Sequence, residues 1–184
     1  MSKIDKSLAV YNIINTLNNV KRRGWIKRQI PERIESVSEH CFAMSNLAIL
    51  INLQYNLNLD MTKVLTMINI HDYGEAKIGD IIPKDGIAKD VKYNMELQAI
   101  TEIMNDHPGQ STIVELWKEF EACQTKEAIF VSLLDKYQSV LQAKEYSKRY
   151  NRIEIYEEFA IYYEQIFKKI AKEELPESAR LLTL

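Results

Sequence analysis

Glycine and proline are scarce in this chain, with five glycines and four prolines among 184 residues. Few residues are therefore available to build tight β-turns, and no segment alternates polar and apolar residues for long. This scarcity favours helices joined by short loops over a sheet. A hydrophobic content of 46% is enough for one sizeable core, so we expect a single domain over residues 1–184.

Blocks of one charge, long apolar runs and paired cysteines are also missing. The 24 basic and 26 acidic residues are interspersed and give a net charge of -2, which argues against a nucleic-acid partner. No apolar run approaches the ~20 residues that span a bilayer, and the amino terminus does not resemble a signal peptide. Cys41 and Cys123 form no CxxC pair, so neither a zinc knuckle nor a redox motif is indicated. We expect buried thiols, a cytoplasmic protein and no membrane partner.

Apolar residues recur at helical spacing through most of the chain. Leu8 and Leu17 mark the apolar stripe of a first helix over about residues 4–20, and a basic loop follows at 21–28. Ser36 stands three residues before Glu39, the spacing of a capping box that starts the next helix. Further helices are predicted over about residues 60–79, 92–105, 112–122, 126–146 and 153–173. The sequence therefore predicts an all-α fold, a single bundle of about six or seven helices.

Histidine occurs three times in the chain, and two of the three stand beside an acid. These two are in the pairs Glu39-His40 and His71-Asp72, inside otherwise apolar stretches. Imidazole nitrogen and carboxylate oxygen are the usual ligands of divalent transition metals, and a mixed set with open positions suits catalysis. The third histidine, His107, lies in a helix-ending turn, and we interpret it as structural.

Two more carboxylates fit the same kind of site. Asp135 follows an apolar run, where an unpaired charge would be costly to bury and a metal would offset that cost. Glu75 is four residues beyond His71, so on a continuous helix it projects from the same side and is placed to act as a base or to hold a water. Taken singly, each residue has an ordinary alternative as a core histidine, a cap or an ion-pair member. The order H…HD…D, with every member on a helix, gives the set its weight.

Five short segments surround these residues, namely GW at 24–25, RIESVSEH at 33–40, HDYGE at 71–75, GDIIPKD at 79–85 and LDK at 134–136. The ordered histidine and aspartate pattern resembles the signature of the HD superfamily of metal-dependent phosphohydrolases. The five segments look like those of the HD-domain 5′-deoxynucleotidases, which remove phosphate from deoxynucleoside monophosphates. The similarity covers a motif-bearing part at about residues 20–146, and the helix expected at about 152–173 adds little that is diagnostic.

The resemblance implies a catalytic divalent metal, with Mn²⁺, Co²⁺ or another transition metal as candidates. Its implied ligands are His40, His71, Asp72 and Asp135. Glu75 becomes the residue that positions or activates the attacking water. In the most similar branch of the family a second ion, for which Mg²⁺ is a candidate, lies beside the positions of Glu75, Asp80 and the backbone of Ile81. Asp80 is also placed to assist the leaving 5′-oxygen.

Trp25 matches an aromatic residue that lies against the sugar and disfavours a 2′-hydroxyl. Some bacterial members carry an arginine directly before that tryptophan, where it contacts phosphate, and this chain has Gly24. Guanidinium and ammonium groups from the same loop are the candidate replacements. They are Arg28, Lys27 and Arg33, and the alternative for all three is a solvated basic loop.

We therefore predict a metal-dependent phosphomonoester hydrolase that acts on a small-molecule nucleotide, most simply a deoxynucleoside 5′-monophosphate. The resemblance also implies a homodimer. One alternative is an HD-superfamily hydrolase of a nucleoside triphosphate, a cyclic dinucleotide or guanosine tetraphosphate. The other is a non-catalytic helical binding module that a metal stabilises.

Overall fold

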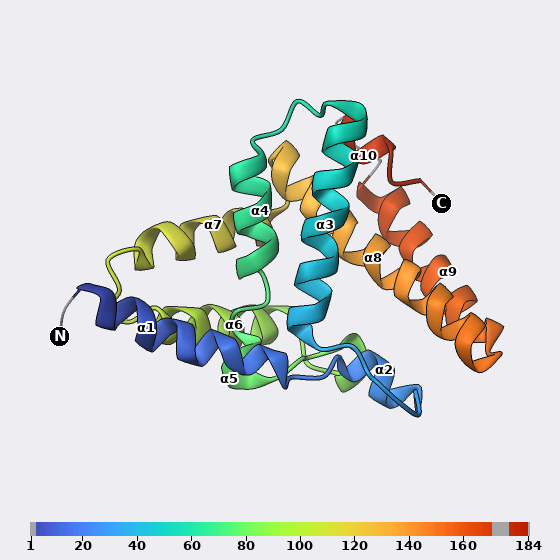
Figure 1. Cartoon of the computed structure of the whole chain (residues 1–184), viewed down its shortest axis with the longest axis horizontal. Coiled ribbons are helices and arrows are strands. Elements are labelled where there is room, and N and C mark those ends of the chain that lie inside the picture. The colour runs from blue at the N-terminus through green and yellow to red at the C-terminus, as the bar shows by residue number, and fades with distance from the viewer. Residues whose placement is uncertain (1–2, 171–176, 184) are drawn as a thin grey trace. The chain divides into compact units, whose positions relative to one another are not determined.

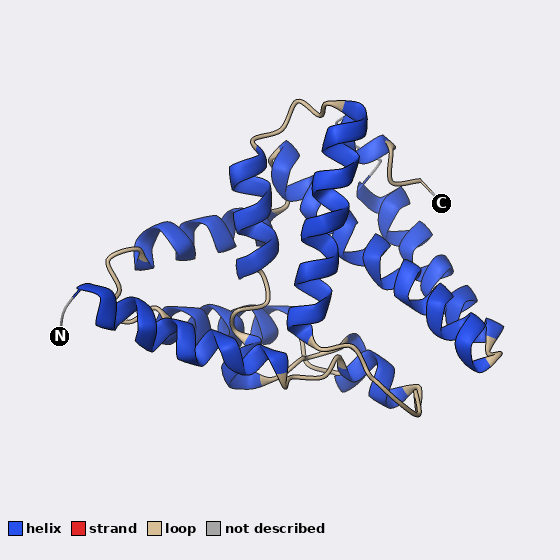
Figure 2. Cartoon of the chain, in the orientation of Figure 1, coloured by secondary structure: helices blue, strands red, loops and turns tan. Residues whose placement is uncertain are grey.

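The computed structural model describes residues 3–170 and 177–183. Within these ranges the regular structure is helical (Figure 2), and the β-type pairing consists of one isolated bridge between Lys21 and Ser36. The described helices of ten residues or more are α1 (Lys3–Ile14), α3 (Val37–Tyr55), α4 (Met61–Ile70), α6 (Lys89–Ile103), α7 (Gln110–Ala122), α8 (Lys126–Tyr150) and α9 (Ile153–Ile170) (Figure 1). Shorter segments are α2 (Arg23–Lys27), α5 (Glu75–Ile78), α10 (Glu177–Arg180) and the 3₁₀ turns η1 (Asn15–Asn18) and η2 (Pro83–Asp85). The all-α prediction is confirmed.

The first helix and the basic loop differ from their predictions. The first helix ends at Ile14 and continues as a 3₁₀ turn, and Leu8, assigned to its apolar stripe, is 51% exposed. Leu17, from the same stripe, is buried. The basic loop contains the short helix α2, which buries Trp25. The last three residues of the helix predicted at 153–173 lie outside the described part of the chain.

The predicted capping box is confirmed by its hydrogen bonds, and Asp60 caps a second helix start. The Ser36 N–H donates to Glu39 Oε2 at 2.8 Å, and the Glu39 N–H donates to Ser36 Oγ at 3.2 Å. At the start of α4, the Lys63 N–H donates to Asp60 Oδ1 at 3.1 Å. Each cap satisfies backbone donors that a helix start leaves without intrahelical partners.

The helix predicted over residues 60–79 is broken by a turn at 71–74, so His71 and Asp72 are not helical. Within the turn, the Glu75 N–H donates to the Asp72 carbonyl at 3.0 Å, one residue short of the α-helical partner. The α-helical partner would be the His71 carbonyl, which instead accepts the indole N–H of Trp117 at 3.1 Å. The His71 carbonyl is therefore bound by a side chain from α7 and not by the Glu75 N–H.

The contacts divide the chain into two compact units, and the first contains Met1–Cys41 and Asn69–Lys118. Its core has two apolar clusters, and Tyr73 and Ala76 pack against both of them. The larger cluster consists of Val10, Ile70, Ile100, Ile103, Met104 and Trp117, and the smaller of Leu17, Val37 and Cys41. The turn at 71–74 is therefore held between an α1, α6 and α7 core and the start of α3.

The second unit contains Phe42–Ile68 and Glu119–Leu184. In it α9 lies along α8 (Figure 1), and the rings of Tyr137 and Tyr163 meet edge to face at 5.7 Å between centroids. The hydroxyl of the buried Tyr163 donates to the carbonyl of Leu182, which ties α9 to the segment after α10. The assignment of residues 1–184 to a single domain stays a prediction. Among the described helices, none is both long and apolar enough to cross a membrane.

Candidate active site

His40 lies in the first turn of α3 and is completely buried. Its N–H donates to the Ser36 carbonyl at 3.0 Å, so the capping box that starts the helix also fixes this histidine. The pattern predicts a ligand at the start of a helix, and the structure places His40 there. Helix α3 begins here because of the cap, and the apolar residues that follow it continue the helix.

His71 and Asp72 reach the same place from the turn between α4 and α5. The His71 and His40 rings lie 5.8 Å apart between centroids. His71 Nε2 and Asp72 Oδ2 are 3.1 Å apart. One ligand atom from each of the three residues can be chosen so that all lie within 4.8 Å of one another.

The donor set and its spacing fit a divalent metal. Bonds of about 2.0–2.2 Å from a metal to nitrogen or oxygen place neighbouring ligand atoms about 3.0–3.5 Å apart. The distance of 3.1 Å between His71 Nε2 and Asp72 Oδ2 falls in that interval. Two imidazoles and one carboxylate leave coordination positions for other ligands, as catalytic sites require.

The charges in the cluster are strongly coupled. Burial opposes ionisation of Asp72, but the neighbouring His71 and then Arg22 outweigh it, so the pKa of the carboxyl lies well below its usual range. Burial opposes protonation of His71, but Asp72 outweighs it and raises the pKa of the imidazole well above its usual range. The metal-free site is therefore an ion pair. A metal binds neutral imidazole and so takes the place of the proton on His71.

Glu75 is buried at the start of α5 beside this cluster, although the helix that carries it is not continuous with α4. Burial, followed by the charges of Asp72 and Asp80, raises the pKa of its carboxyl well above the usual range. Its Oε2 atom is buried and has no hydrogen-bond partner among the described residues. A buried carboxylate oxygen in this state is costly, and a cation or a held water would offset the cost.

Asp80 follows α5 and is also buried. Its Oδ2 atom accepts the backbone N–H of Arg23 at 2.6 Å, so it connects the Gly79–Asp80 segment to α2. Burial raises the pKa of its carboxyl, with Arg22 acting in the opposite sense. Ile81, the next residue, is buried. The role of Asp80 and of the Ile81 backbone at a second ion stays a prediction.

Asp135 belongs to α8 in the second unit, so its placement as a fourth ligand stays a prediction. The residue is buried, as the apolar run before it indicates. Its Oδ2 atom lies 2.5 Å from the Lys136 ammonium, and its carbonyl accepts the Ser139 hydroxyl at 3.1 Å.

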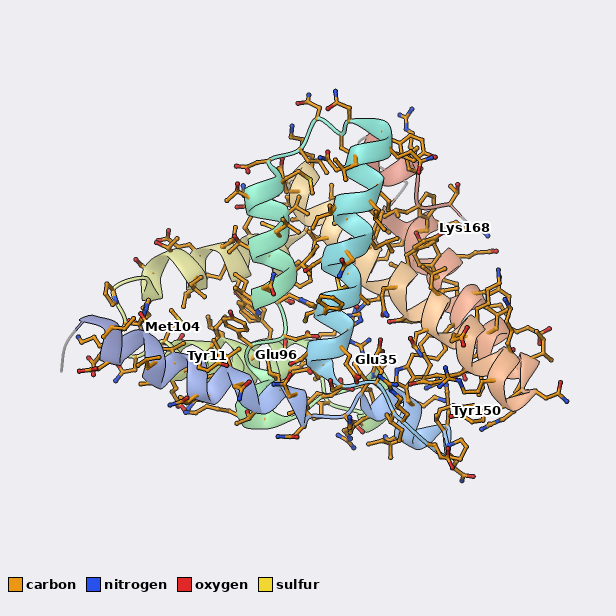
Figure 3. The ribbon with its side chains drawn as sticks, in the orientation of Figure 1. Tyr11, Glu35, Glu96, Met104, Tyr150 and Lys168 are labelled. Atoms are coloured by element: carbon orange, nitrogen blue, oxygen red, sulfur yellow. The ribbon has the colours of Figure 1, made fainter. Side chains whose placement is uncertain are left out.

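Trp25 lies in α2 and is 1% exposed. Its indole N–H donates to Glu35 Oε2 at 3.0 Å, and Figure 3 labels this glutamate just before α3. The ring is therefore anchored between two segments of the same unit. Its contact with a sugar stays a prediction.

The three basic residues named as phosphate-binding candidates all have other partners. Lys27 Nζ lies 2.6 Å from Asp85 Oδ1, and Arg28 donates to the Gly24 carbonyl of its own helix at 2.7 Å. Arg33 has a side chain that is 82% exposed and pairs with Glu39 at 3.9 Å. Their role in substrate binding stays a prediction.

Two residues near the cluster were missed by sequence reasoning. Arg22 lies 3.7 Å from Asp72 Oδ2, and Trp117 holds the His71 carbonyl. No spacing distinguishes Arg22 from the basic residues around it, and Trp117 is 46 residues from His71 in the chain. His107, by contrast, lies in the expected turn, where its Nδ1 accepts the Gly109 N–H at 3.0 Å. That tautomer leaves a proton on Nε2, which faces Ser7 Oγ at 3.2 Å.

Comparison with known proteins identifies the family. A family model described as HD domain matches residues 14–179. The chain is 36% identical over 154 residues to the 5′-deoxynucleotidase HDDC2 of Dictyostelium discoideum, covering 80% of each chain. It is 36% identical over 141 residues to HDDC2 of Homo sapiens, covering 76% of this chain and 67% of that one.

Solved structures share the fold. A protein from Pyrococcus horikoshii superposes with a TM-score of 0.75 at 25% identity, covering 97% of this chain and 95% of that chain. A structure described as a predicted metal-dependent phosphohydrolase, from Magnetospirillum magnetotacticum, gives a TM-score of 0.70 at 22% identity, covering 99% and 94% of the two chains. The family match spans most of the chain and includes the histidine and aspartate cluster, so this chain belongs to the HD-domain family.

Proposed function

We propose that this chain is a metal-dependent 5′-deoxynucleotidase, which hydrolyses deoxynucleoside 5′-monophosphates to deoxynucleosides and phosphate. The observation that carries the proposal is the cluster of the buried His40 and His71 with the half-buried Asp72. Relatives that carry the name 5′-deoxynucleotidase support the substrate class, because the similarity covers 80% of both chains in one of them. We further propose that the protein is cytoplasmic.

The three clustered residues hold a divalent metal in this proposal, with Mn²⁺ or Co²⁺ as the first candidates. Asp135 is the proposed fourth ligand. Glu75, Asp80 and the Ile81 carbonyl are the proposed surroundings of a second ion, for which Mg²⁺ is a candidate. Hard oxygen ligands of this kind suit Mg²⁺, whereas imidazole suits the transition metals.

A bound divalent metal would polarise the phosphoryl group and lower the pKa of water from about 15.7 towards about 7. Glu75 is the proposed acceptor of a proton from the attacking water, because its Oε2 is buried with no hydrogen-bond partner among the described residues. Burial and the charges of Asp72 and Asp80 raise the pKa of its carboxyl, and a cation beside it would lower that pKa again and favour the ionised form that a base needs. Asp80 is the proposed donor to the leaving 5′-oxygen. The raised pKa of its carboxyl favours the protonated form that such a donor needs.

Trp25 is the residue proposed to disfavour a ribose 2′-hydroxyl. Its indole is held by Glu35, so the ring is fixed in one orientation. A fixed ring discriminates by shape better than a mobile one. A homodimer is also proposed, and the exposed apolar residues Phe42, Leu50 and Leu53 of α3 supply surface that such an interface requires.

A non-catalytic, metal-stabilised module is the main alternative. Glu75 disfavours it, because a structural site has no use for a further buried carboxylate whose Oε2 makes no hydrogen bond among the described residues. Another nucleotide within the same superfamily is the second alternative. Both are separated from the proposal by one panel of assays.

The test measures phosphate release from deoxyribo- and ribonucleoside 5′-monophosphates, a nucleoside triphosphate and a cyclic dinucleotide, each with Mn²⁺, Co²⁺ and Mg²⁺. We expect metal-stimulated release from the deoxyribonucleoside monophosphates. His71→Ala and Asp72→Ala should reduce the release to background while helical circular dichroism is retained. His107→Ala is the matched control and should keep wild-type activity, because that histidine lies at a turn outside the cluster. Absence of release from every monophosphate would overturn the proposal, and equal rates on ribo and deoxy substrates would remove the role of Trp25.

A further inference from the structure

Several of the protein side chains at the proposed site are acidic. Asp72, Glu75 and Asp80 influence one another, since the charges of Asp72 and Asp80 both raise the pKa of Glu75. A phosphomonoester brings up to two further negative charges. Like charges at short range are unfavourable in a partly buried site, so a cationic side chain there would stabilise the bound phosphate in addition to a metal.

Three basic residues of α2 and the position after it pair with groups outside the cluster of His40, His71 and Asp72. Arg23 makes a two-point contact with Asp85, at 2.9 and 3.0 Å, and Lys27 reaches the same carboxylate at 2.6 Å. Arg28 turns back to the Gly24 carbonyl. These three charges therefore lie at the η2 loop or along α2 itself.

Arg22 has a different placement. Its Nη1 atom lies 3.7 Å from Asp72 Oδ2, and its side chain is 17% exposed. This distance is longer than the 2.7–3.2 Å of a hydrogen bond, so the contact between Arg22 and Asp72 is an ion pair. The guanidinium is therefore beside the proposed metal ligand and still reached by solvent.

The backbone holds Arg22 in this position. Its N–H donates to the Glu35 carbonyl at 3.0 Å, and its own carbonyl accepts the Trp25 N–H at 3.1 Å. The preceding residue, Lys21, forms the isolated bridge with Ser36. The segment that carries Arg22 is thus paired to the start of α3, which also carries His40.

The charge of Arg22 reaches all three carboxylates of the site. Burial is the largest influence on the pKa of Asp72, Glu75 and Asp80, and Arg22 lowers the pKa of each against it. A guanidinium in this place stabilises any anion that enters the cluster. Its planar array of N–H donors also matches the oxygens of a phosphate group.

We propose that Arg22 binds the phosphate of the substrate, because its guanidinium lies beside Asp72 and is reached by solvent. This inference rests on the proposed function for its substrate, but phosphate binding can be measured without turnover. The backbone of Arg22 pairs with Glu35, just before the start of α3. Arg22 is therefore a substrate-binding residue.

The first test titrates inorganic phosphate into the Mn²⁺-loaded protein by calorimetry. We expect Arg22→Ala to weaken phosphate binding by about 10- to 100-fold, the usual effect of losing charge-assisted hydrogen bonds. Arg22→Lys keeps the charge but loses the planar array of donors. Its phosphate affinity should therefore lie between those of the wild type and Arg22→Ala. Lys77→Ala is the control, because Lys77 pairs with Glu102 on the surface at 2.6 Å, and it should bind phosphate as the wild type does. Unchanged binding in Arg22→Ala, or a larger loss in Lys27→Ala or Arg28→Ala, would overturn the inference.

Metal affinity separates this role from a purely structural one. If Arg22 only held Asp72 in place, its removal would weaken Mn²⁺ binding. If Arg22 is a phosphate ligand, removing a positive charge near Asp72 leaves Mn²⁺ affinity unchanged or raises it. We expect the second result, and a tenfold or greater loss of Mn²⁺ affinity in both Arg22→Ala and Arg22→Lys would overturn the proposal.

A second-site variant tests whether the function can be restored from position 24. A Cβ atom at Gly24 would meet Arg28 Nη1 at 3.7 Å, which is an ordinary contact, so a side chain fits there. We expect the double variant Arg22→Ala with Gly24→Arg to bind phosphate at least about fivefold more tightly than Arg22→Ala, because one charge-assisted contact is restored. Recovery would identify the lost property as phosphate binding.

Steady-state kinetics on a deoxynucleoside monophosphate then distinguishes the two proposals. A wild type that binds phosphate through Arg22 but releases none from any monophosphate contradicts the proposed function alone. A wild type that is active while Arg22→Ala has unchanged kcat/KM and phosphate affinity contradicts the Arg22 proposal alone. We expect an active wild type and a kcat/KM in Arg22→Ala that falls by at least about tenfold, with the larger part in KM.

Discussion

The indole N–H of Trp117 donates a hydrogen bond of 3.1 Å to the carbonyl oxygen of His71. Trp117 is fully buried, and its ring packs on Tyr93 with 5.2 Å between centroids. A core residue of α7 thereby fixes the backbone of a proposed metal ligand. The helix before that ligand ends at Ile70, and the Glu75 N–H donates to the Asp72 carbonyl and not to that of His71.

Trp117→Phe should therefore weaken metal binding as well as the fold. The phenyl ring keeps part of the packing, but the buried His71 carbonyl loses its donor, which costs about 1–3 kcal/mol of unfolding free energy. Loss of a partner that orients a ligand typically lowers metal affinity by about 10- to 100-fold. Urea denaturation and calorimetric Mn²⁺ titration measure the two effects.

Ile155→Val provides the comparison, because Ile155 is buried in α9 of the second unit. It should cost about 0.5–1.5 kcal/mol of stability and leave Mn²⁺ affinity unchanged. Equal metal affinity in Trp117→Phe and wild type would show that the Trp117 bond is only a packing detail.

Local signals in the sequence were enough to predict most helix starts. Ser36 and Glu39 satisfy one another's backbone donors within one turn, so their spacing alone indicates the start of α3. Asp60 acts in the same way at α4. His40 was predicted as a ligand on other grounds, because it stands beside Glu39 and comes first in the ordered pattern of histidines and aspartates.

The break before Glu75 had no such signal. The turn at 71–74 is contacted by Trp117, which is far along the chain, and Gly74 lies close to the backbone of α6. Arg22 was missed for the same kind of reason, because only the pairing of its segment with Glu35 separates it from Arg23. Pairings between distant residues leave no spacing in the sequence.

Substitution by alanine should lower the stability of the fold at Gly74 and raise it at Gly24. A Cβ atom at Gly74 would lie 3.3 Å from the carbonyl oxygen of Glu96, labelled in Figure 3, and the rigid backbone of α6 must then shift. Such crowding costs about 1–3 kcal/mol. Gly24 has no contact shorter than 3.7 Å and lies within α2, so alanine there should stabilise by about 0.5–1 kcal/mol.

Thermal and urea denaturation of Gly74→Ala and Gly24→Ala compares these signs directly. Because Gly74 precedes Glu75, the shift should also reduce phosphate release by the metal-loaded enzyme. A Gly74→Ala protein as stable as the wild type would mean that α6 yields without cost, contrary to this account.

Tyr163 should make the protein lose stability at alkaline pH. Burial, followed by the neighbouring Tyr137, raises the pKa of its hydroxyl above the usual value of 10.0. The folded state therefore keeps the proton when the unfolded state begins to release it. The resulting stability is fully present below about pH 10 and falls by up to about 1.4 kcal/mol per pH unit above it, until the folded pKa is reached.

Tyr163→Phe removes this ionisation and also the hydrogen bond to the Leu182 carbonyl. We expect it to be less stable than the wild type by about 0.5–1.5 kcal/mol at pH 8, with the difference shrinking as the pH rises above about 10. Urea denaturation at pH 8, 9.5 and 10.5 tests this. A difference that grows with pH would contradict the direction of the pKa shift.

Asp135→Asn addresses the fourth proposed ligand. The substitution keeps the volume of a buried side chain in α8 but removes the negative charge that a divalent metal requires. We expect Mn²⁺ affinity to fall by more than about 100-fold, beyond the loss typical of an outer partner. Lys136→Ala is the matched control, because it removes the cation 2.5 Å from the same carboxylate while leaving the carboxylate itself.

The readout for Asp135→Asn is metal-dependent stabilisation, which does not depend on any substrate. A ligand that binds only the folded state adds about 2.7 kcal/mol of stability when it is present at 100 times its Kd. Wild type and Lys136→Ala should both gain about this amount at the Mn²⁺ concentration that gives it for the wild type, and Asp135→Asn should gain almost none. If Asp135→Asn gains as much as the wild type, Asp135 is not a ligand, and the buried carboxylate is explained by its pairing with Lys136 and by the packing of α8.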